Sequence, residues 1–241
     1  MTNLSVNINK IALLRNSRGR DYPNVLNFAK KFIELGAQGI TIHPRQDERH
    51  ITMNDAYDLG NYFEELDEVE LNIEGYPSED FLSLVEAIKP DQCTLVPDGP
   101  NQLTSDHGWD LKTDMDFVKS SIDRLKQSEI RTAIFLDPDV EQVKLVPETK
   151  ADRIELYTEQ YASSFHGPEK NHIFKKFEAA ALLAQKLSIG VNAGHDLDLE
   201  NLPKFLEIDN ILEVSIGHVL TIECIENGMP QVIEKYLNIC S

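Results

Sequence analysis

The sequence predicts a single-domain (β/α)8 barrel, the TIM-barrel architecture, over residues 1–241. Short apolar segments of strand length alternate with helical segments, and eight such units follow one another about thirty residues apart. The strand segments are mostly apolar and β-branched, which is typical of a parallel sheet covered on both faces. No linker or low-complexity tract divides the chain, so one α/β domain is the simplest interpretation.

The first half of the chain supplies four strands and three helices. Pro44 ends the second strand, because proline has no N–H to donate within a sheet, and Gly36 and Pro90 end helices. Residues 9–23 are rich in arginine and asparagine and are expected to form a loop. The predicted strands are 4–8, 39–43, 70–74 and 92–96, and the predicted helices are 24–35, 54–66 and 78–88.

The second half repeats the pattern with longer polar connections. Residues 98–113 and the stretch after the sixth strand are expected to be long loops, and the seventh helix is short. A single closing helix is expected after the last strand. The predicted strands are 131–136, 153–157, 189–192 and 212–216, and the predicted helices are 115–127, 140–145, 173–187, 202–206 and 219–237.

Composition and charge restrict the partners and the location. The net charge of −18 argues against nucleic acid as a main partner, because a phosphate backbone binds basic surfaces. A local cluster of Arg and His can still hold a small anionic substrate. Three cysteines without metal-ligand spacing, no signal peptide and no segment of transmembrane length predict a cytoplasmic protein with no membrane partner.

The ends of the predicted strands carry the residues for chemistry. In a (β/α)8 barrel the active site forms at the carboxyl ends of the strands. Histidines and carboxylates at these positions predict proton transfer, because histidine titrates near neutrality and a buried Glu can be tuned to do so. In chain order, the residues are Asn7, His43 with Arg45 and His50, Glu74, Thr104, Glu155, His195, and Gly217 with His218.

Two features predict phosphate binding. Gly217 and His218 precede the last helix, where the absence of a side chain on Gly217 would let backbone N–H groups approach a phosphate. Arg45 with His50, and with Arg18, could hold a second anion through charge-assisted hydrogen bonds. The sequence therefore favours a substrate, or a pair of substrates, with two phosphate groups.

Other enzyme classes lack their residues. The first strand has no His-x-His pair for a metal-dependent hydrolase, and no metal site is predicted. Lys10 is the nearest candidate for a Schiff-base lysine, but it lies beyond the end of the first strand. There is no GxSxG elbow and no Walker-type loop. Residues 98–100 are interpreted as a turn.

Short motifs along nearly the whole chain resemble one enzyme family. They are Val6–Ile8, Leu14–Gly19, Gly39–Arg45, Arg49–Ile51, Leu71–Glu74, Leu95–Pro97, Ile154–Glu155, Tyr161–Ala162, Val191–His195 and Ile216–His218. In this order they resemble pyridoxine 5′-phosphate synthase of the deoxyxylulose-dependent route to vitamin B6. The resemblance implies a transferase that condenses 3-amino-2-oxopropyl phosphate with 1-deoxy-D-xylulose 5-phosphate. The implied products are pyridoxine 5′-phosphate, phosphate and water.

The resemblance also implies roles for individual residues. His43 and Glu74 would accept protons, His195 would donate one, and Glu155 would support them. The resemblance implies neither a metal nor an organic cofactor. It implies a homo-octameric assembly. The aminoketone phosphate would be held by Asn7, Arg18, Gly217 and His218, and the deoxyxylulose phosphate by Arg45, His50 and Thr104.

The chain departs from the family pattern at substrate-binding positions. Asn9 and Lys10 stand where the family has Asp-His, and Asp196 stands where it has Gly. Two alternatives therefore stay open at the level of sequence. One is another phosphate-binding barrel, such as an isomerase or aldolase, and the other is a non-catalytic barrel that keeps the phosphate sites.

Overall fold

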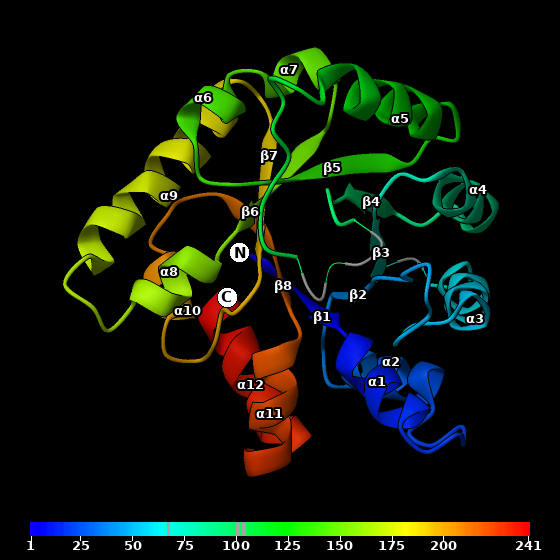
Figure 1. Cartoon of the computed structure of the whole chain (residues 1–241). Helices are drawn as coiled ribbons and strands as arrows, with labels where there is room; N and C mark the ends of the chain where they lie inside the picture. Colours follow the sequence, from blue (N-terminus) through cyan, green and yellow to red (C-terminus); the bar gives the residue numbers. More distant parts are fainter. Residues whose placement is uncertain (67, 100–101, 103–104) are drawn as a thin grey trace.

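A closed parallel barrel forms the centre of the computed structural model, with its strands in chain order from β1 to β8 (Figure 1). This confirms the predicted (β/α)8 architecture. The structure describes residues 1–66, 68–99, 102 and 105–241. The strands are β1 (Asn3–Asn7), β2 (Gly39–Ile42), β3 (Glu70–Gly75), β4 (Gln92–Leu95), β5 (Arg131–Leu136), β6 (Arg153–Tyr157), β7 (Gly190–Gly194) and β8 (Ile211–Ile216).

Helices surround the barrel on its outer side (Figure 1). The long ones are amphipathic and bury one face against the strands, as the helical spacing of their apolar residues predicts. They are α1 (Asn9–Asn16), α2 (Val25–Glu34), α3 (Met53–Phe63), α4 (Glu79–Ile88), α5 (Met115–Gln127), α6 (Val140–Val143), α7 (Val146–Thr149), α8 (Glu159–Ser164), α9 (Lys170–Lys186), α10 (Leu202–Phe205), α11 (His218–Asn227) and α12 (Met229–Cys240).

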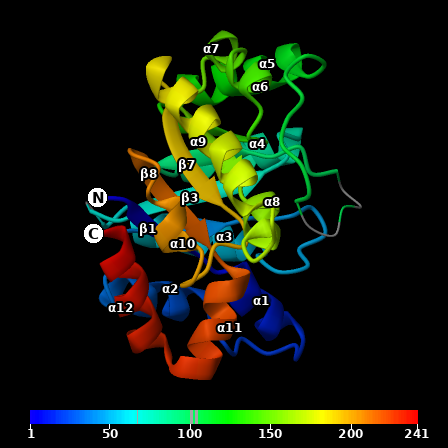
Figure 2. The ribbon, with the colours of Figure 1, turned by 90° about the vertical axis from the view of Figure 1, so that its left-hand side faces the viewer.

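Three expectations about loops and helices were wrong. Residues 9–16 form α1 rather than a loop, because Ile11, Ala12 and Arg15 make one buried face and the other residues of the helix are partly or fully exposed. Residues 159–164 form α8 within the expected loop after β6. The closing helix is two helices, since Gly228 adopts a φ of +88° between α11 and α12 (Figure 2).

The inside of the barrel carries many polar side chains, although the sequence predicted mostly apolar strands in a sheet covered on both faces. Neighbouring strands contribute a row of polar side chains at mid-height. Ser5 and Thr41 share a hydrogen bond of 2.7 Å, and Thr94 Oγ1 donates to Asn72 Oδ1 over 3.0 Å. Strands such as β3 therefore alternate, with polar side chains toward the barrel axis and apolar ones outward. The sequence of β3 already alternates polar and apolar residues, but the prediction was based on the high apolar content of the strands as a group.

Charged side chains fill the barrel near the amino ends of the strands. Arg131 forms an ion pair with Glu70 and donates to Gln92 Oε1 over 3.0 Å. Asn192 Nδ2, on β7, donates to Glu213 Oε1 over 3.2 Å. Burial raises the pKa of Glu213 to about 7, and the nearby Arg153 opposes the rise. These groups leave the opposite, carboxyl-terminal end as the part of the barrel available to substrates.

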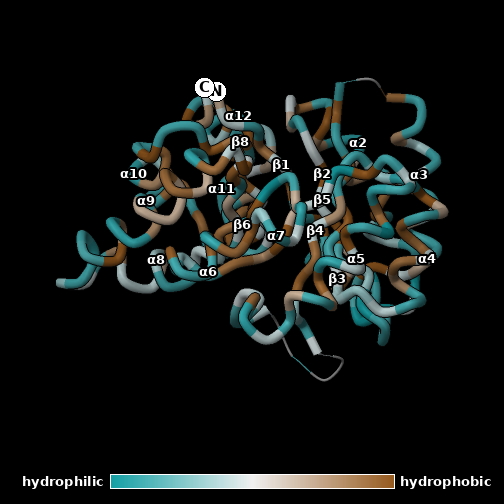
Figure 3. Tube along the Cα trace, turned by 90° about the horizontal axis from the view of Figure 1, so that it is seen from above, coloured by the Kyte–Doolittle hydropathy of each residue, from teal (hydrophilic) through white to brown (hydrophobic). Residues whose placement is uncertain are grey.

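The apolar core lies between the strands and the helices. Outward-facing residues such as Ile40, Ile73 and Leu95 are buried against helical residues such as Phe32 and Leu59. Apolar residues accordingly gather along the strands and on the parts of the helices next to them, and polar residues lie further out (Figure 3). The chain ends lie side by side, where Thr2 N donates to Cys240 O over 2.8 Å (Figure 3). None of the helices in the described part of the chain has the length and apolar character for crossing a bilayer.

Candidate active site

Side chains from distant strands meet at the carboxyl-terminal mouth of the barrel. Asn7 ends β1 and its Nδ2 donates to Glu74 Oε2, on β3, over 3.5 Å. A Cβ built on Gly194, at the end of β7, would overlap the carboxylate of Glu155 on β6. Gly217 follows β8 and packs against Asn7, with its hypothetical Cβ 3.0 Å from Asn7 Cβ. The predicted strand-end residues on β1, β3, β6, β7 and β8 therefore lie around one mouth.

Two carboxyl groups at this mouth hold protons more strongly than usual. Burial raises the pKa of Glu74 to about 8, and the negative charges of Asp98 and Glu213 add to the rise. Burial likewise raises the pKa of Glu155 well above its usual value, and the charge of Glu74 adds to that rise. Glu155 is only 2% exposed, and within the described residues its Oε2 has no hydrogen-bond partner. Glu74 is suited to exchanging a proton near neutral pH, and Glu155 holds its proton more strongly than a free carboxyl group.

His43 and His50 are buried neighbours after β2, with ring centroids 6.1 Å apart. Burial and the charge of Arg45 lower the pKa of His43 well below its usual value. The same two causes lower the pKa of His50 to about 4. His50 Nδ1 accepts a hydrogen bond from Ile51 N over 3.0 Å, which leaves its proton on Nε2. Both imidazoles are therefore neutral at pH 7, and a neutral imidazole can accept a proton.

His195 is held by its surroundings directly after β7. Its Nδ1 lies 2.9 Å from Asp196 Oδ2, and its ring packs edge-on against Tyr157 with 5.0 Å between centroids. The hydrogen bond from His195 lowers the pKa of Asp196, so this carboxylate stays charged. His195 and Asp196 have φ values of +88° and +59°, in the left-handed region, and Thr158 Oγ1 donates to the carbonyls of Gly194 and His195.

The carboxylate of Asp196 thus has a role that the sequence did not reveal. Aspartate is among the residues that best tolerate a positive φ, which suits position 196. A carboxylate that accepts a hydrogen bond from one imidazole nitrogen fixes the orientation of the ring. Asp196 therefore holds the ring of His195 in place at the mouth.

Asn9 and Lys10 begin α1 beside the mouth. Asn9 Oδ1 accepts a hydrogen bond from His43 N over 2.9 Å, and Asn9 N donates to Asn7 Oδ1 over 3.1 Å. The side chain of Asn9 therefore links β1 to β2. The positive charge of Lys10 acts on both His50 and Asp196, whose pKa values it lowers. Lys10 is therefore close enough to both residues for its charge to act on them.

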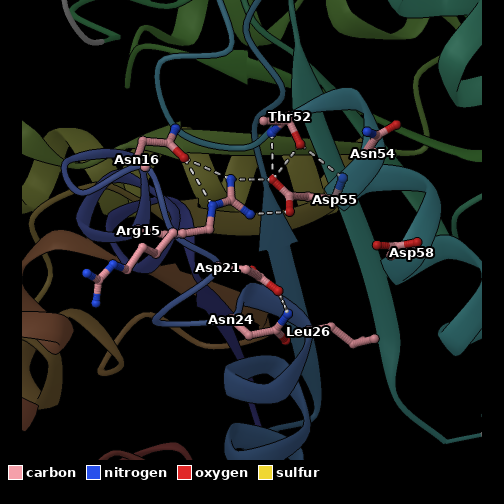
Figure 4. A pocket seen from close by; sticks show the side chains of 11 residues that line it. Arg15, Asn16, Asp21, Asn24, Leu26, Thr52, Asn54, Asp55 and Asp58 are labelled. Atoms are coloured by element: carbon pink, nitrogen blue, oxygen red, sulfur yellow. Dashed lines mark hydrogen bonds and ion pairs between the residues drawn. The ribbon is translucent and has the colours of Figure 1, made fainter.

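Arg15 and Asn16 hold the segment that carries His50, and Figure 4 shows how Arg15 and Asn16 lie beside Thr52 and Asp55. Arg15 forms an ion pair with Asp55, and Asp55 also closes a capping box with Thr52 at the start of α3. Asn16 Nδ2 donates to the carbonyl of His50 over 2.8 Å, and Arg15 Nη2 donates to the same oxygen over 3.3 Å. This contact could not be predicted, because Arg15 and His50 meet only in the folded chain.

The remaining predicted residues are Arg18, Thr104 and His218. Arg18 is exposed in the turn after α1, and none of its described contacts joins it to the strand ends. Thr104 lies outside the described residues. His218 is exposed at the first position of α11, which has Gly217 as its N-cap. Among the described residues, no group of His, Cys, Asp and Glu is arranged to hold a metal ion.

Asp98 was interpreted as part of a turn, and this was incomplete. Its side chain is buried and forms an ion pair with Arg45. Ser105 Oγ also donates to the same carboxylate oxygen, Oδ2, over 2.7 Å. The predicted anion-binding arginine therefore already has an anionic partner within the chain.

Substituting Gly194 with alanine is expected to lower turnover by about tenfold or more, since small displacements of catalytic groups are costly. The new methyl group would overlap Glu155 Oε1 and lie 3.2 Å from its Cδ, so the carboxylate must move. Steady-state kinetics measure this effect. Gly190→Ala is the control, because its methyl group meets Arg153 and Leu212 at the other end of β7. Equal turnover of Gly194→Ala and the wild type would contradict the placement of Glu155 in the site.

Stability is expected to fall as the pH rises from about 6.5 to 8. Glu74, Glu155 and Glu213 have raised pKa values, so the folded state binds more protons than the unfolded state in this interval. His43 and His50 have lowered values and act oppositely, but only below their unfolded pKa of 6.5. Glu74 alone contributes a loss on the order of 1–2 kcal/mol.

Thermal unfolding at a series of pH values measures this dependence. The Glu74→Gln variant should show a shallower decline, because glutamine cannot lose a proton. A midpoint that rises between pH 6.5 and 8 would contradict the raised pKa of these carboxyl groups.

The comparisons with known proteins agree on one family. Residues 4–241 match the family of the pyridoxal phosphate biosynthesis protein PdxJ. A pyridoxine 5′-phosphate synthase from Parabacteroides distasonis is 47% identical over 237 residues, which cover 98% of each chain. The pyridoxine 5′-phosphate synthase of Bacteroides thetaiotaomicron is 48% identical over 240 residues and 99% of each chain.

Solved structures share the fold at low sequence identity. The tryptophan synthase α-subunit of Pyrococcus furiosus superimposes with a TM-score of 0.67 and 14% identity, over 98% of this chain and 97% of its own. The N-(5′-phosphoribosyl)anthranilate isomerase of the same organism gives a TM-score of 0.60 at 13% identity, over 100% of this chain and 98% of its own. These similarities bear on the barrel architecture alone.

Proposed function

Since this chain belongs to the PdxJ family of pyridoxal phosphate biosynthesis proteins and acts as a pyridoxine 5′-phosphate synthase, we propose that the reaction takes place at the carboxyl-terminal mouth of its barrel. The main support is the gathering of Asn7, Glu74, Glu155 and His195 around that mouth. The proposed substrates are 3-amino-2-oxopropyl phosphate and 1-deoxy-D-xylulose 5-phosphate. The products are pyridoxine 5′-phosphate, phosphate and water.

The acid and base roles follow from the protonation states. His43 is neutral at pH 7 and accepts a proton. Glu74 accepts one after it has lost its own, which its pKa of about 8 permits in a sizeable fraction of molecules. His195 donates a proton, with Asp196 holding its ring in place. Glu155 supports these transfers from its buried position. Ring closure between an aminoketone and a ketose needs such repeated transfers, because an imine forms and water and phosphate leave.

The two phosphate groups have different sites in this proposal. Asn7, Gly217 and His218 receive the phosphate of the aminoketone at the start of α11, and Arg18 is proposed to assist. Arg45 and His50 receive the phosphate of the ketose, together with Thr104. The charge of Lys10 acts on both His50 and Asp196 and so supports both anions.

Self-association is proposed on the same family basis, as a homo-octamer in the cytoplasm. Support comes from exposed apolar side chains on neighbouring helices, since surfaces of this kind often form subunit contacts. They are Leu13 and Leu14 on α1, and Ile222 and Ile225 on α11.

Incubation with both phosphorylated substrates tests the function directly. The expected result is pyridoxine 5′-phosphate, detected by its absorbance and mass, with one inorganic phosphate released per molecule. Release of phosphate without ring formation would favour another sugar-phosphate enzyme. Binding of both substrates without turnover would favour a non-catalytic barrel.

A further inference from the structure

Arg45 is enclosed and paired within the chain. Its Nη2 forms an ion pair with Asp98 Oδ2, and its Nη1 donates to Gln102 O over 3.2 Å. The Arg45 side chain is 9% exposed and the Asp98 side chain 1%. A guanidinium removed from water in this way needs an anion beside it, because an unpaired buried charge is strongly destabilising.

Asp98 is held unevenly by its neighbours. Its Oδ2 accepts hydrogen bonds from both Arg45 and Ser105, whereas its Oδ1 is buried and has no partner among the described residues. The carboxylate also lies close enough to Glu74 for its charge to raise the pKa of Glu74. Arg45 forms the ion pair with Asp98, and Arg49 lies close enough for the charge of Asp98 to raise its pKa.

We propose that Asp98 is an internal anion, which occupies the guanidinium of Arg45 in the substrate-free protein and is exchanged for the phosphate of the ketose substrate. The inference rests on the proposed function, because that function supplies the phosphate at Arg45. Carboxylate and phosphate use the same planar N–H donors of arginine, and phosphate carries more charge and more acceptor oxygens. Arg45 therefore has an anionic partner before and after binding.

The exchange also explains how phosphate can leave. The reaction releases inorganic phosphate, and an isolated buried arginine would retain it strongly. The return of Asp98 to Arg45 offsets that retention. Asp98 therefore sets the affinity of Arg45 for phosphate and does not touch the reacting carbon atoms.

Calorimetric titration with inorganic phosphate tests the exchange without any turnover. Asp98→Asn keeps the shape of the side chain and an acceptor for Ser105 but removes the charge. It is expected to bind phosphate about tenfold more tightly than the wild type, which is the scale of one hydrogen bond to a charged group. Asp106→Asn is the matched control, because it removes the same charge from an exposed residue nearby that contacts Gln102 and His107 rather than Arg45.

The double variant Asp98→Asn with Arg45→Gln shows whether the additional phosphate affinity arises at Arg45. It should not bind phosphate more tightly than the wild type, since phosphate bound beside Gly217 and His218 does not depend on Arg45. Unchanged or weaker phosphate binding by Asp98→Asn overturns the proposal, as does a gain that persists without Arg45.

Wild-type crystals soaked in phosphate give a second test if Asp98→Asn does not fold. The proposal expects phosphate on Arg45, with Asp98 moved out of hydrogen-bonding distance. An intact Arg45–Asp98 pair beside bound phosphate overturns it. Failure of the wild type to form pyridoxine 5′-phosphate would refute the proposed function instead, and the phosphate titrations would still decide the role of Asp98.

Discussion

Replacing Glu74 with glutamine is expected to lower kcat by about 10²- to 10⁴-fold, the usual contribution of a general acid or base. Glutamine has nearly the same shape and can still contact Asn7, but it cannot accept a proton. The KM values of both substrates should change little, because the proposed phosphate-binding residues are untouched. Steady-state kinetics with each substrate varied in turn measure both parameters.

The pH dependence of kcat in the wild type shows whether Glu74 accepts or donates a proton. As a proton acceptor, Glu74 is active only when ionised, so kcat should rise as the pH passes through about 8. The Glu74→Gln variant should lack this rise. Glu70→Gln is the control, because Glu70 lies at the other end of β3 and pairs with Arg131. A rate that falls through pH 8 and loses that fall in Glu74→Gln would show that Glu74 donates its proton.

Replacing His195 with asparagine is expected to lower kcat by about 10²-fold or more, since the proposed proton donor is removed. Asparagine tolerates the positive φ of +88° at this position, so the backbone conformation can persist. The binding of inorganic phosphate should remain close to that of the wild type.

Circular dichroism and thermal unfolding of His195→Asn check that its loss of activity is not a loss of structure. His166→Asn, at an exposed position near Glu200, is the control for changing one histidine. Turnover within a few-fold of the wild type in His195→Asn would exclude His195 as the donor.

The fold could be predicted because each strand and most helices are specified locally. Proline after His43 and glycine after Leu35 mark boundaries that depend only on backbone chemistry. Helix α1 was not predicted because its buried face has only three residues, and one of them is the charged Arg15. The break between α11 and α12 at Gly228 was not predicted, because apolar residues continue at helical spacing on both sides of it.

The candidate site could be predicted where it depends on strand ends alone. His43, Glu74 and Glu155 follow from the rule that parallel strands share one catalytic edge. The partners of these residues could not be predicted, because they come from tertiary contacts. Asp98 reaches Arg45 across 53 residues, and Arg15 reaches Asp55 across 40. Burial inside the barrel, which sets the pKa of Glu74, is likewise a property of the closed fold.

A crystal structure of the Glu74→Gln variant with both substrates tests whether the reaction takes place at the mouth of the barrel. We expect one phosphate beside Gly217 and His218, the other on Arg45 and His50, and reacting atoms within about 3 Å of residue 74 and His195. The outer pocket lined by Arg15, Arg20, Asp21 and Asp58 should hold neither substrate (Figure 4). Substrates bound in that pocket, with the mouth of the barrel empty, would contradict the account.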